Sequence, residues 1–263
     1  MKIVSWNVNG IRAVHKKGFF DYMNQEQPDI IGLQEVRAEY DQIDEDKRAP
    51  EGYHAFYNPC KIKKGYSGVA IYTKHKPESV TNGFGVEQFD QEGRVIQADF
   101  GDFIVINVYF PKAYSEREAN GDAKKLARLT YKMEFYSALW EYISTLRKKG
   151  RSVIVCGDYN TAHTSIDLAR PKENTQTSGF LEMERKRLDE LVTMGFTDTF
   201  RLFQPEGGHY TWWSQQSGAR ERNVGWRIDY HFASNDLLPR LTNGIQRSDV
   251  FGSDHCPVVV ELK

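Results

Sequence analysis

Residues 153–160, Val153-Ile154-Val155-Cys156-Gly157-Asp158-Tyr159-Asn160, predict a buried strand that ends in two polar side chains. A continuous apolar run of this length, closed by a glycine, is typical of a strand in the interior of a sheet. Because side chains alternate along an extended chain, Asp158 and Asn160 are expected to point to one side and Tyr159 to the other. Such a pair suits a phosphate or a metal ion, but an ordinary strand followed by an Asp/Asn turn has the same pattern.

Other strand-like segments also end in, or run into, carboxylates, amides or histidine. Residues 2–10 bring Asn7 and Asn9 to a glycine turn, and residues 29–35 close an apolar run with a glutamate. Residues 225–232 predict a further strand, and a closing strand is expected at 256–260. On the assumption that the strand ends converge, they would bring together Asn7, Glu35, Asp158, Asn160, Asp229, Asp254 and His255.

The rest of the chain predicts one α/β domain. Apolar residues at three-and-four spacing indicate a long helix over about 121–150 and a second one over about 178–194. The two halves of the chain each open with a strand that ends in an amide or a carboxylate, which suits two packed sheets with helices outside. Further strands are expected at residues 53–57, 68–73, 95–100 and 103–110.

The composition is that of a soluble globular protein. Of its 263 residues, 40% are apolar and 27% charged, and no apolar run approaches the length of a membrane span, so we expect a cytoplasmic protein. Cys60, Cys156 and Cys256 are widely spaced and form no CxxC pair, which argues against a disulfide framework or a zinc site. The net charge of −1 permits a polyanionic partner without indicating one.

The polar set at the strand ends predicts a chemistry. Several carboxylates in one cleft repel each other unless a cation or a proton is present. Oxygen ligands without a cysteine and histidine cluster favour Mg²⁺ or Mn²⁺ over zinc. Hydrolysis of a phosphate ester uses all of these groups, because the metal neutralises phosphate oxygens, one carboxylate takes a proton from water, and a histidine oriented by a second carboxylate stabilises the transition state.

Five motifs, taken in order, carry a family resemblance. They are Ser5-Trp6-Asn7-Val8-Asn9-Gly10-Ile11-Arg12-Ala13, Leu33-Gln34-Glu35, Gly157-Asp158-Tyr159-Asn160, Asn223-Val224-Gly225-Trp226-Arg227-Ile228-Asp229-Tyr230 and Ser253-Asp254-His255-Cys256-Pro257. In this order they resemble the signatures of the exonuclease III family of apurinic/apyrimidinic (AP) endonucleases, from the first residue to the last few. Residues 160–174 are similar to the vertebrate-type branch of that family.

The resemblance implies a four-layer α/β sandwich, with two mixed β-sheets packed face to face between layers of helices. It implies that residues 1–263 form a single endonuclease/exonuclease/phosphatase catalytic domain. It further implies a monomeric, Mg²⁺-dependent enzyme that cuts duplex DNA on the 5′ side of an abasic site and leaves a 3′-hydroxyl. Activity on 3′-blocked ends, as a 3′-5′ exonuclease or 3′-phosphodiesterase, often accompanies this incision in the family.

The resemblance also implies roles for individual residues. Metal binding would fall to Glu35 as the principal ligand, with Asn7, Asn9, Asp158, Asn160, Asp254 and His255. Catalysis would fall to Asp158, Asn160, His255, Asp229 and Tyr109, and substrate binding to Asn174, Trp212, Trp226 and Ile228. Large apolar rings suit a pocket for a flipped-out deoxyribose that has lost its base.

The sequence departs from the vertebrate-type pattern in two places, and three alternative functions are considered beside the AP endonuclease. Asn9 stands where vertebrate-type members have an aspartate, and Ser115 and Gln216 stand in the loops that push an arginine and a methionine into DNA in that branch. The nearest alternative is therefore a specialised 3′-end exonuclease and phosphodiesterase with little incision at abasic sites. Relatives that hydrolyse inositol phosphates or sphingomyelin are disfavoured by the 223–230 motif. A DNA-binding module without activity would not need the four residues Glu35, Asp158, Asp229 and His255 together.

Overall fold

The side chains of strand β8 (Val153–Asp158) pack in two directions. Val153 and Val155 join the apolar cluster under helix α5 (Ala123–Lys148), while Ile154 and Cys156 join the cluster between the two sheets. Every residue of β8 is buried, because a layer covers each of its faces. The expectation of a central buried strand is confirmed.

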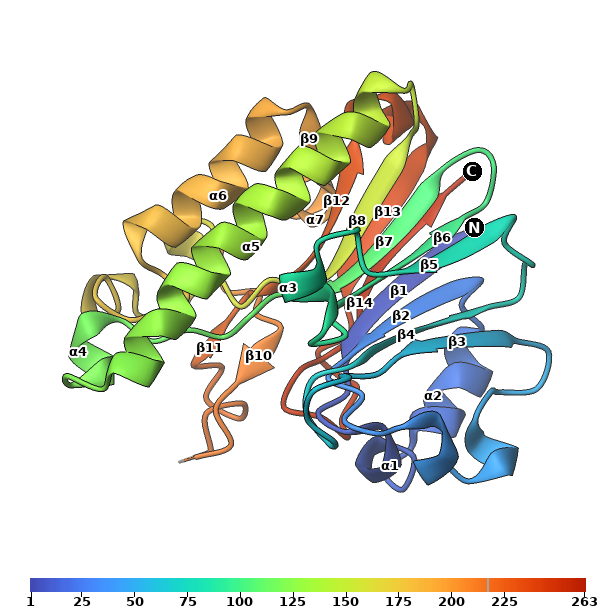
Figure 1. The fold of residues 1–263 in the computed structure, drawn as a ribbon, viewed down its shortest axis with the longest axis horizontal. Helices are drawn as coiled ribbons and strands as arrows, with labels where there is room; N and C mark the ends of the chain where they lie inside the picture. Colours follow the sequence, from blue (N-terminus) through green and yellow to red (C-terminus); the bar gives the residue numbers. More distant parts are fainter. Residues whose placement is uncertain (217) are drawn as a thin grey trace.

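The computed structural model describes residues 1–216 and 218–263 and contains two six-stranded mixed sheets (Figure 1). One has the strand order β13-β14-β1-β2-β4-β3 and the other β5-β6-β7-β8-β12-β9, while β10 and β11 form a separate pair. Strands β1 and β2 are parallel, as are β7 and β8; the other pairs are antiparallel. The strands are β1 Lys2–Asn7, β2 Ile30–Gln34, β3 His54–Asn58, β4 Val69–Thr73, β5 Ser79–Asn82, β6 Val95–Asp99, β7 Ile104–Tyr109, β9 Phe196–Asp198, β10 Trp212–Trp213, β11 Gly225–Trp226, β12 Asp229–Ser234, β13 Leu241–Gln246 and β14 Val258–Leu262.

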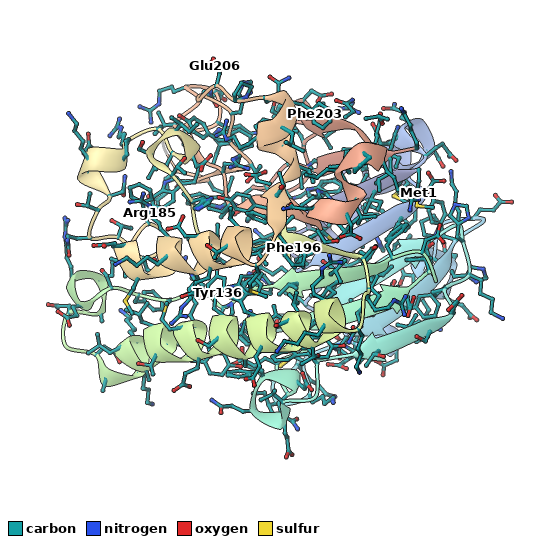
Figure 2. The ribbon with its side chains drawn as sticks, turned by 90° about the horizontal axis from the view of Figure 1, so that it is seen from above. Met1, Tyr136, Arg185, Phe196, Phe203 and Glu206 are labelled. Atoms are coloured by element: carbon teal, nitrogen blue, oxygen red, sulfur yellow. The ribbon has the colours of Figure 1, made fainter. Side chains whose placement is uncertain are left out.

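Helices cover the outer face of each sheet, so the predicted four-layer sandwich is confirmed. α2 packs on the first sheet, while α5 and α6 lie side by side on the second, as the view from above shows (Figure 2). No helix in the two described ranges is long and apolar enough to cross a membrane. The other helices are α1 Ile11–Val14, α2 Phe19–Glu26, α3 Glu87–Asp90, α4 Glu116–Ala119, α6 Glu182–Thr193 and α7 Thr199–Phe203, with short 3₁₀ turns at Tyr40–Gln42, Glu45–Lys47, Ser165–Asp167, Pro171–Glu173 and Asn235–Arg240.

Gly157 allows β8 to approach β7 immediately before the first polar side chain at the strand end. It pairs with Val108 and has a φ of 144°, and a Cβ at this position would lie 1.8 Å from the Val108 carbonyl oxygen. Only glycine fits here. The close approach fixes where Asp158 leaves the sheet.

The structure corrects one predicted strand. Residues 225–232 form two short strands, because the chain turns at Arg227 and Ile228. The Arg227 amide donates to the Asp167 carbonyl over 2.7 Å, and its buried guanidinium donates to the carboxylates of Asp167 and Asp198. Arg227 therefore bonds to Asp167 and to the Asp198 side chain instead of pairing with a neighbouring strand, and the predicted strand divides there. β11 pairs with β10, and β12 pairs with β8.

Candidate active site

The strand ends open into one cleft of ≈ 690 Å³. Ten of the residues expected at the site line this cleft, whereas Asn7 and Asp229 lie buried beneath it and are bonded to residues that do line it. Asn174 lies apart, and its side-chain amide donates to the Arg170 carbonyl over 2.8 Å. The ten are Asn9, Glu35, Tyr109, Asp158, Asn160, Trp212, Trp226, Ile228, Asp254 and His255.

Asp158 lies at the buried centre of the cleft floor. It ends β8 beside Asp229 of β12, and the Asn7 side-chain amide donates to its carboxylate over 2.9 Å. The Asn160 backbone amide donates to the same carboxylate over 2.8 Å. Burial and the neighbouring Asp229 carboxylate raise the pKa of Asp158 to about 7, against the opposing effect of His255. At neutral pH this carboxyl group is therefore poised to exchange a proton.

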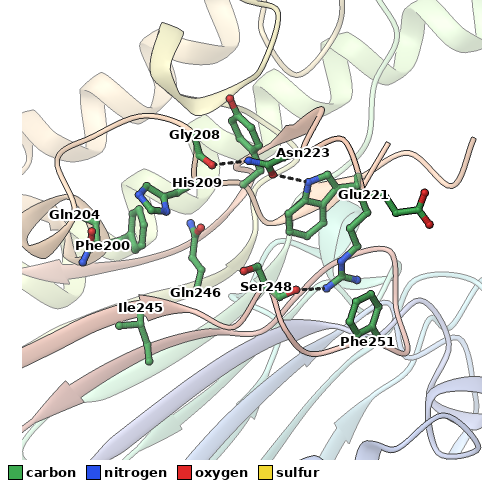
Figure 3. Close-up of a pocket in the computed structure, with 13 residues that line it drawn as sticks. Phe200, Gln204, Gly208, His209, Glu221, Asn223, Ile245, Gln246, Ser248 and Phe251 are labelled. Carbon is green, nitrogen blue, oxygen red and sulfur yellow. Dashed lines mark hydrogen bonds between the residues drawn. The ribbon is translucent and has the colours of Figure 1, made fainter. Parts of the chain in front are cut away.

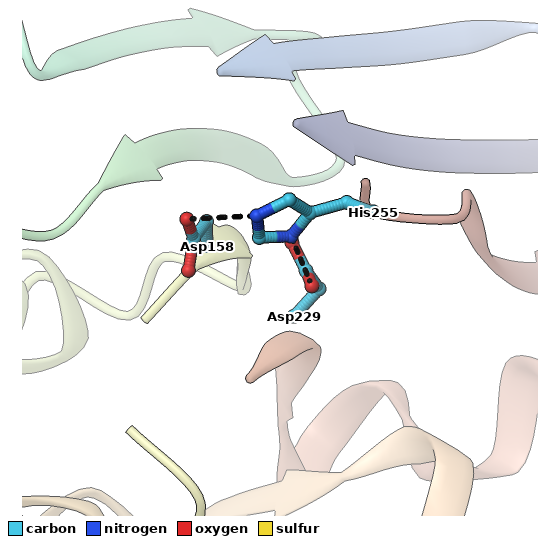
Figure 4. A group of neighbouring side chains, drawn as sticks. All are labelled: Asp158, Asp229 and His255. Atoms are coloured by element: carbon cyan, nitrogen blue, oxygen red, sulfur yellow. Dashed lines mark hydrogen bonds and ion pairs between the residues drawn. The ribbon is translucent and has the colours of Figure 1, made fainter. Parts of the chain in front are cut away.

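His255 stands between two carboxylates (Figure 4). Its Nδ1 lies 2.9 Å from Asp229 Oδ2, and its Nε2 lies 3.9 Å from Asp158 Oδ2. Burial alone would lower the pKa of His255, but the two carboxylates outweigh burial and raise it to about 10. The ring is thus held as a cation that faces the cleft.

Glu35 lies beside Asp158 because Asn7 joins them. The Asn7 side-chain NH₂ donates to Glu35 Oε2 over 3.0 Å and to Asp158 Oδ2 over 2.9 Å, and Arg37 forms an ion pair with the other oxygen of Glu35. Glu35 and Asn160 have left-handed backbone angles, with φ of 57° and 49°. Strained angles of this kind at strand exits are common at functional sites, where the surrounding contacts hold them.

A second set of contacts orients Asp254. The Asn9 side-chain amide donates to its Oδ1 over 2.8 Å, and the Trp212 indole donates to its Oδ2 over 3.1 Å. Burial opposes ionisation of Asp254, but His255 and the two hydrogen bonds prevail and lower its pKa. As arranged, Asn9 presents its NH₂ to a carboxylate, as Asn7 does, so both amides orient acidic groups; their role as metal ligands stays a prediction.

The wall of the cleft combines aromatic and apolar side chains. Tyr109 ends β7 directly beside Asp158, and burial and Glu35 raise the pKa of its phenol well above its usual value. Trp212, Trp226 and Ile228 form an apolar cluster with the buried Phe180, and the Phe180 and Trp226 rings meet edge to face at 6.4 Å. Three members of this cluster, Trp212, Trp226 and Ile228, give the cleft an apolar wall.

Comparison with known proteins identifies the family. Residues 4–255 match the Endonuclease/Exonuclease/phosphatase family. The chain belongs to this family. An exodeoxyribonuclease of Bacillus subtilis (strain 168) is 44% identical over 260 residues, which cover 98% of each protein. The DNA repair nuclease APEX1 of Danio rerio is 40% identical over 264 residues, which cover 100% of this chain and 82% of that protein. A solved structure, an AP endonuclease from Archaeoglobus fulgidus, shares 29% identity and a TM-score of 0.88, over 100% of this chain and 99% of the other.

Membership of the endonuclease/exonuclease/phosphatase family confirms the prediction of a hydrolytic nuclease and agrees with a metal-binding site in the cleft. Asp158, Asp229 and His255 form a group that could bind a metal ion. Each offers one ligand atom, a carboxylate oxygen or a ring nitrogen, and the three atoms lie within 4.8 Å of one another. The raised pKa of His255 means that a metal at this point would have to displace a proton, because a protonated imidazole offers no lone pair.

Several members of the cleft were not predicted from the sequence. Arg37, Tyr66 and Lys112 line it, and Arg94 lies beneath Tyr109 with its guanidinium 4.8 Å from the ring centroid. The Lys61–Lys64 run is basic in sequence and leads into this region, but nothing in the sequence around Arg94 distinguishes it from a surface arginine. In fact it is 2% exposed and bonded to Glu92 over 2.6 Å.

The two loop positions noted in the sequence have different surroundings. Ser115 is buried and caps α4, since its hydroxyl accepts the Glu118 amide over 3.2 Å. Gln216 is exposed, and its backbone amide donates to the Ser214 hydroxyl over 3.3 Å. The Ser115 side chain is therefore buried and hydrogen-bonded within the protein, while Gln216 is exposed to solvent.

A second pocket, of ≈ 520 Å³, is lined by Trp213 of β10 together with Gly208, Asn223 and Ser248 (Figure 3). Several of its polar groups are bonded within the protein: the Trp213 indole donates to Asn223 over 3.2 Å, Asn223 donates to the Gly208 carbonyl over 2.9 Å, and Arg220 donates to the Ser248 carbonyl over 3.0 Å. None of the predicted site residues is among the described residues that line it. The cleft lined by ten of the predicted residues is therefore the candidate active site.

Proposed function

We propose that this protein is a Mg²⁺-dependent DNA-repair nuclease that hydrolyses the phosphodiester 5′ to abasic sites in duplex DNA and leaves a 3′-hydroxyl. The observation that carries the proposal is the cleft in which Asp158, His255 and Glu35 form a polar floor beside the apolar wall of Trp212 and Trp226. The relatives support it, because they are named as a DNA repair nuclease, an exodeoxyribonuclease and an AP endonuclease.

Three residues of the cleft divide the work of hydrolysis. Asp158, with its pKa near 7, takes a proton from the attacking water and can return it to the leaving oxygen. His255, held as a cation by Asp229, stabilises the negative charge that develops on the phosphate. Asn160, whose side chain lies 3.3 Å from Asp158, positions the attacking water or a phosphate oxygen.

The donor set at Glu35 fits a hard divalent cation. Glu35 and Asp254 offer carboxylate oxygens to the cleft, and the depressed pKa keeps Asp254 ionised. Oxygen donors of this kind prefer Mg²⁺, with Mn²⁺ as the substitute. We assign Glu35 as the principal ligand, with Asp254, Asn7 and Asn9 around it, and when bound the ion would neutralise charge on the phosphate oxygens.

The apolar wall explains selection of a sugar that has lost its base. Trp226 and Ile228 line the cleft and belong to a packed apolar cluster, which supports their assignment to the wall that would receive an extruded deoxyribose. A rigid apolar wall accepts a bare sugar, and an abasic residue costs less to extrude because it has no base to unstack. We extend the proposal to one catalytic domain over residues 1–263, acting as a cytoplasmic monomer.

A cleavage assay tests the proposal. Purified protein is given a duplex with one internal abasic analogue, in Mg²⁺ and in EDTA, and the products are separated on a denaturing gel. We expect a single metal-dependent nick that leaves a 3′-hydroxyl, and Asp189→Asn on the exposed face of α6 serves as the neutral control. If the protein binds Mg²⁺ but cuts neither this duplex nor a 3′-end, the site assignment is wrong.

The second candidate is a nuclease specialised for 3′-ends. It is favoured by the burial of Ser115 in a helix cap, which withdraws that side chain from DNA, and by the relative named as an exodeoxyribonuclease. A second duplex with a recessed, 3′-blocked end separates the two candidates. Removal of the block without incision of the internal site would favour the 3′-specialised enzyme.

A further inference from the structure

A buried ion pair lies behind the cleft, between helices α5 and α6. Lys132 Nζ lies 2.7 Å from Glu184 Oε1, and both side chains are 0% exposed. Taking two charges out of water is costly, and an apolar pair of similar size often serves stability as well or better. Stability alone therefore does not explain this ion pair, and both charged groups also bind parts of the backbone near the cleft.

Lys132 reaches the backbone of a proposed catalytic residue. Its ammonium group donates to the Asn160 carbonyl over 2.8 Å. Four residues further along the same helix face, the Tyr136 hydroxyl donates to the Tyr159 carbonyl over 2.9 Å. Two successive carbonyls at the exit of β8 are thus held by α5, at the point where Asn160 takes its left-handed φ of 49°.

Glu184 holds the facing rim of the cleft. Its carboxylate accepts the amides of Gly179 and Leu181, over 2.5 and 3.1 Å, and the Ser178 hydroxyl over 2.9 Å. Ser178 and Gly179 line the cleft. Gly179 also packs against the Asn160 carbonyl and the Trp226 ring so closely that a Cβ would lie 3.1 Å and 3.3 Å from them.

We propose that Lys132 is a positioning residue, which sets the Asn160 side chain over the cleft floor and, through Glu184, sets the rim at residues 178–181. An ammonium group can donate to the Asn160 carbonyl and to the Glu184 carboxylate at once, which a neutral apolar residue cannot do. Asn160 in turn reaches Asp158 and the Phe110 carbonyl with its side-chain amide, over 3.3 and 3.0 Å. The inference rests on the proposed nuclease function.

The test variant is Lys132→Met with Glu184→Gln. It removes both buried charges together, so neither is left unpaired, and the new glutamine retains an oxygen for the Gly179 and Leu181 amides. We expect the protein to fold and kcat for incision to fall about 10- to 100-fold, the cost of a small displacement of a catalytic group. KM should change less than about threefold, since neither Lys132 nor Glu184 lines the cleft.

A double-mutant cycle separates positioning from general destabilisation. If Lys132 acts through Asn160, the same double substitution should change kcat by less than about twofold when Asn160→Ala is already present. Ile143→Ala, in the buried face of α5 but remote from Asn160, is the matched control and should lower stability without changing kcat. An equal fall in both backgrounds, or no fall in either, would overturn the inference.

Amide hydrogen exchange gives a readout that does not need activity. Lys132→Met alone leaves Glu184 without its cation, and we expect the amides of Gly179 and Leu181 to exchange faster than in the wild type. A wild-type protein that fails to cut DNA would overturn the proposed function. Unchanged exchange at both amides would overturn the positioning role by itself.

Discussion

Asp167 lies at the centre of a buried network that supports the apolar wall of the cleft. Its carboxylate accepts the Arg227 guanidinium over 2.7 Å, forms an ion pair with Arg201, and accepts the Thr164 amide over 2.8 Å. Burial alone would raise the pKa of Asp167, but the two guanidinium groups outweigh it and lower the pKa from 3.8 to about 2. We predict that this carboxylate makes the stability of the fold depend on pH.

The magnitude follows from the two pKa values. A carboxyl group whose pKa is lower in the folded than in the unfolded state stabilises the fold above the unfolded pKa, and this stabilisation is lost as the pH falls through the folded pKa. The difference between 3.8 and about 2 corresponds to roughly 2 kcal/mol at 1.36 kcal/mol per pKa unit. The contribution is complete at neutral pH, and roughly half of it is lost at about pH 3.

Urea unfolding of the wild type and of Asp167→Asn, between pH 7 and pH 3, measures this contribution. Asp167→Asn should be less stable at pH 7 by about 3 to 5 kcal/mol, because it leaves the buried Arg227 with only one of its two carboxylate partners and also removes the partner of Arg201. The difference in the free energy of unfolding between the two proteins should shrink by about 1 kcal/mol at pH 3, since protonation of Asp167 destabilises the wild type and the variant has no carboxylate there to protonate. Asp189→Asn, whose carboxylate is exposed, should show no such narrowing.

One result would refute this reasoning. If the gap between wild type and Asp167→Asn stays constant from pH 7 to pH 3, the pKa of Asp167 is not depressed in the folded state. The network would then contribute no pH-dependent stability between pH 7 and pH 3.

Three further predictions concern the floor of the cleft. Asp158→Asn should abolish turnover and leave DNA affinity in a gel-shift assay largely intact; near-normal turnover would remove Asp158 from its role. Asp229→Asn should lower kcat at pH 7.5 at least about tenfold, because the carboxylate that does most to raise the pKa of His255 is lost and burial lowers that pKa. The control Asp189→Asn breaks the pair between Asp189 and His163 and should leave kcat unchanged. Equal effects of the two variants on kcat would contradict the role of the Asp229–His255 pair. Chelation with EDTA should stop cleavage and Mg²⁺ should restore it, and full activity after exhaustive chelation would argue against a metal in the cleft.

Much of the fold could be predicted from the sequence because its signals are local. The apolar run of residues 153–158 and the spacing of the helix over 123–148 each reflect burial within a single element, and both elements lie where expected. The strand over 225–232 was predicted wrongly because its alternation continues through Arg227 without interruption. Its turn depends on carboxylates at positions 167 and 198, whose proximity no local pattern encodes.

The site shows the same division between local and long-range information. Polar residues at strand ends indicated Glu35 and Asp158, but their convergence was an assumption until Asn7 was found bonded to both, across 28 and 151 residues of sequence. In the irregular segment after β8, Asn174 was expected near the substrate, yet Thr177, Ser178 and Gly179 line the cleft. A segment without periodicity gives no basis for choosing which of its residues face inward.

Lys132 carries a sequence signal for a buried ionic partner. It is followed by Met133, Phe135 and Tyr136 in the most strongly patterned helix of the chain, and all four side chains are buried. A lysine within the buried part of such a helix requires a partner, because an uncompensated ammonium group is not tolerated there. The sequence therefore implied a hidden acid for Lys132, and only the fold could identify it as Glu184 of the neighbouring helix, 52 residues away, and connect the pair to the Asn160 carbonyl.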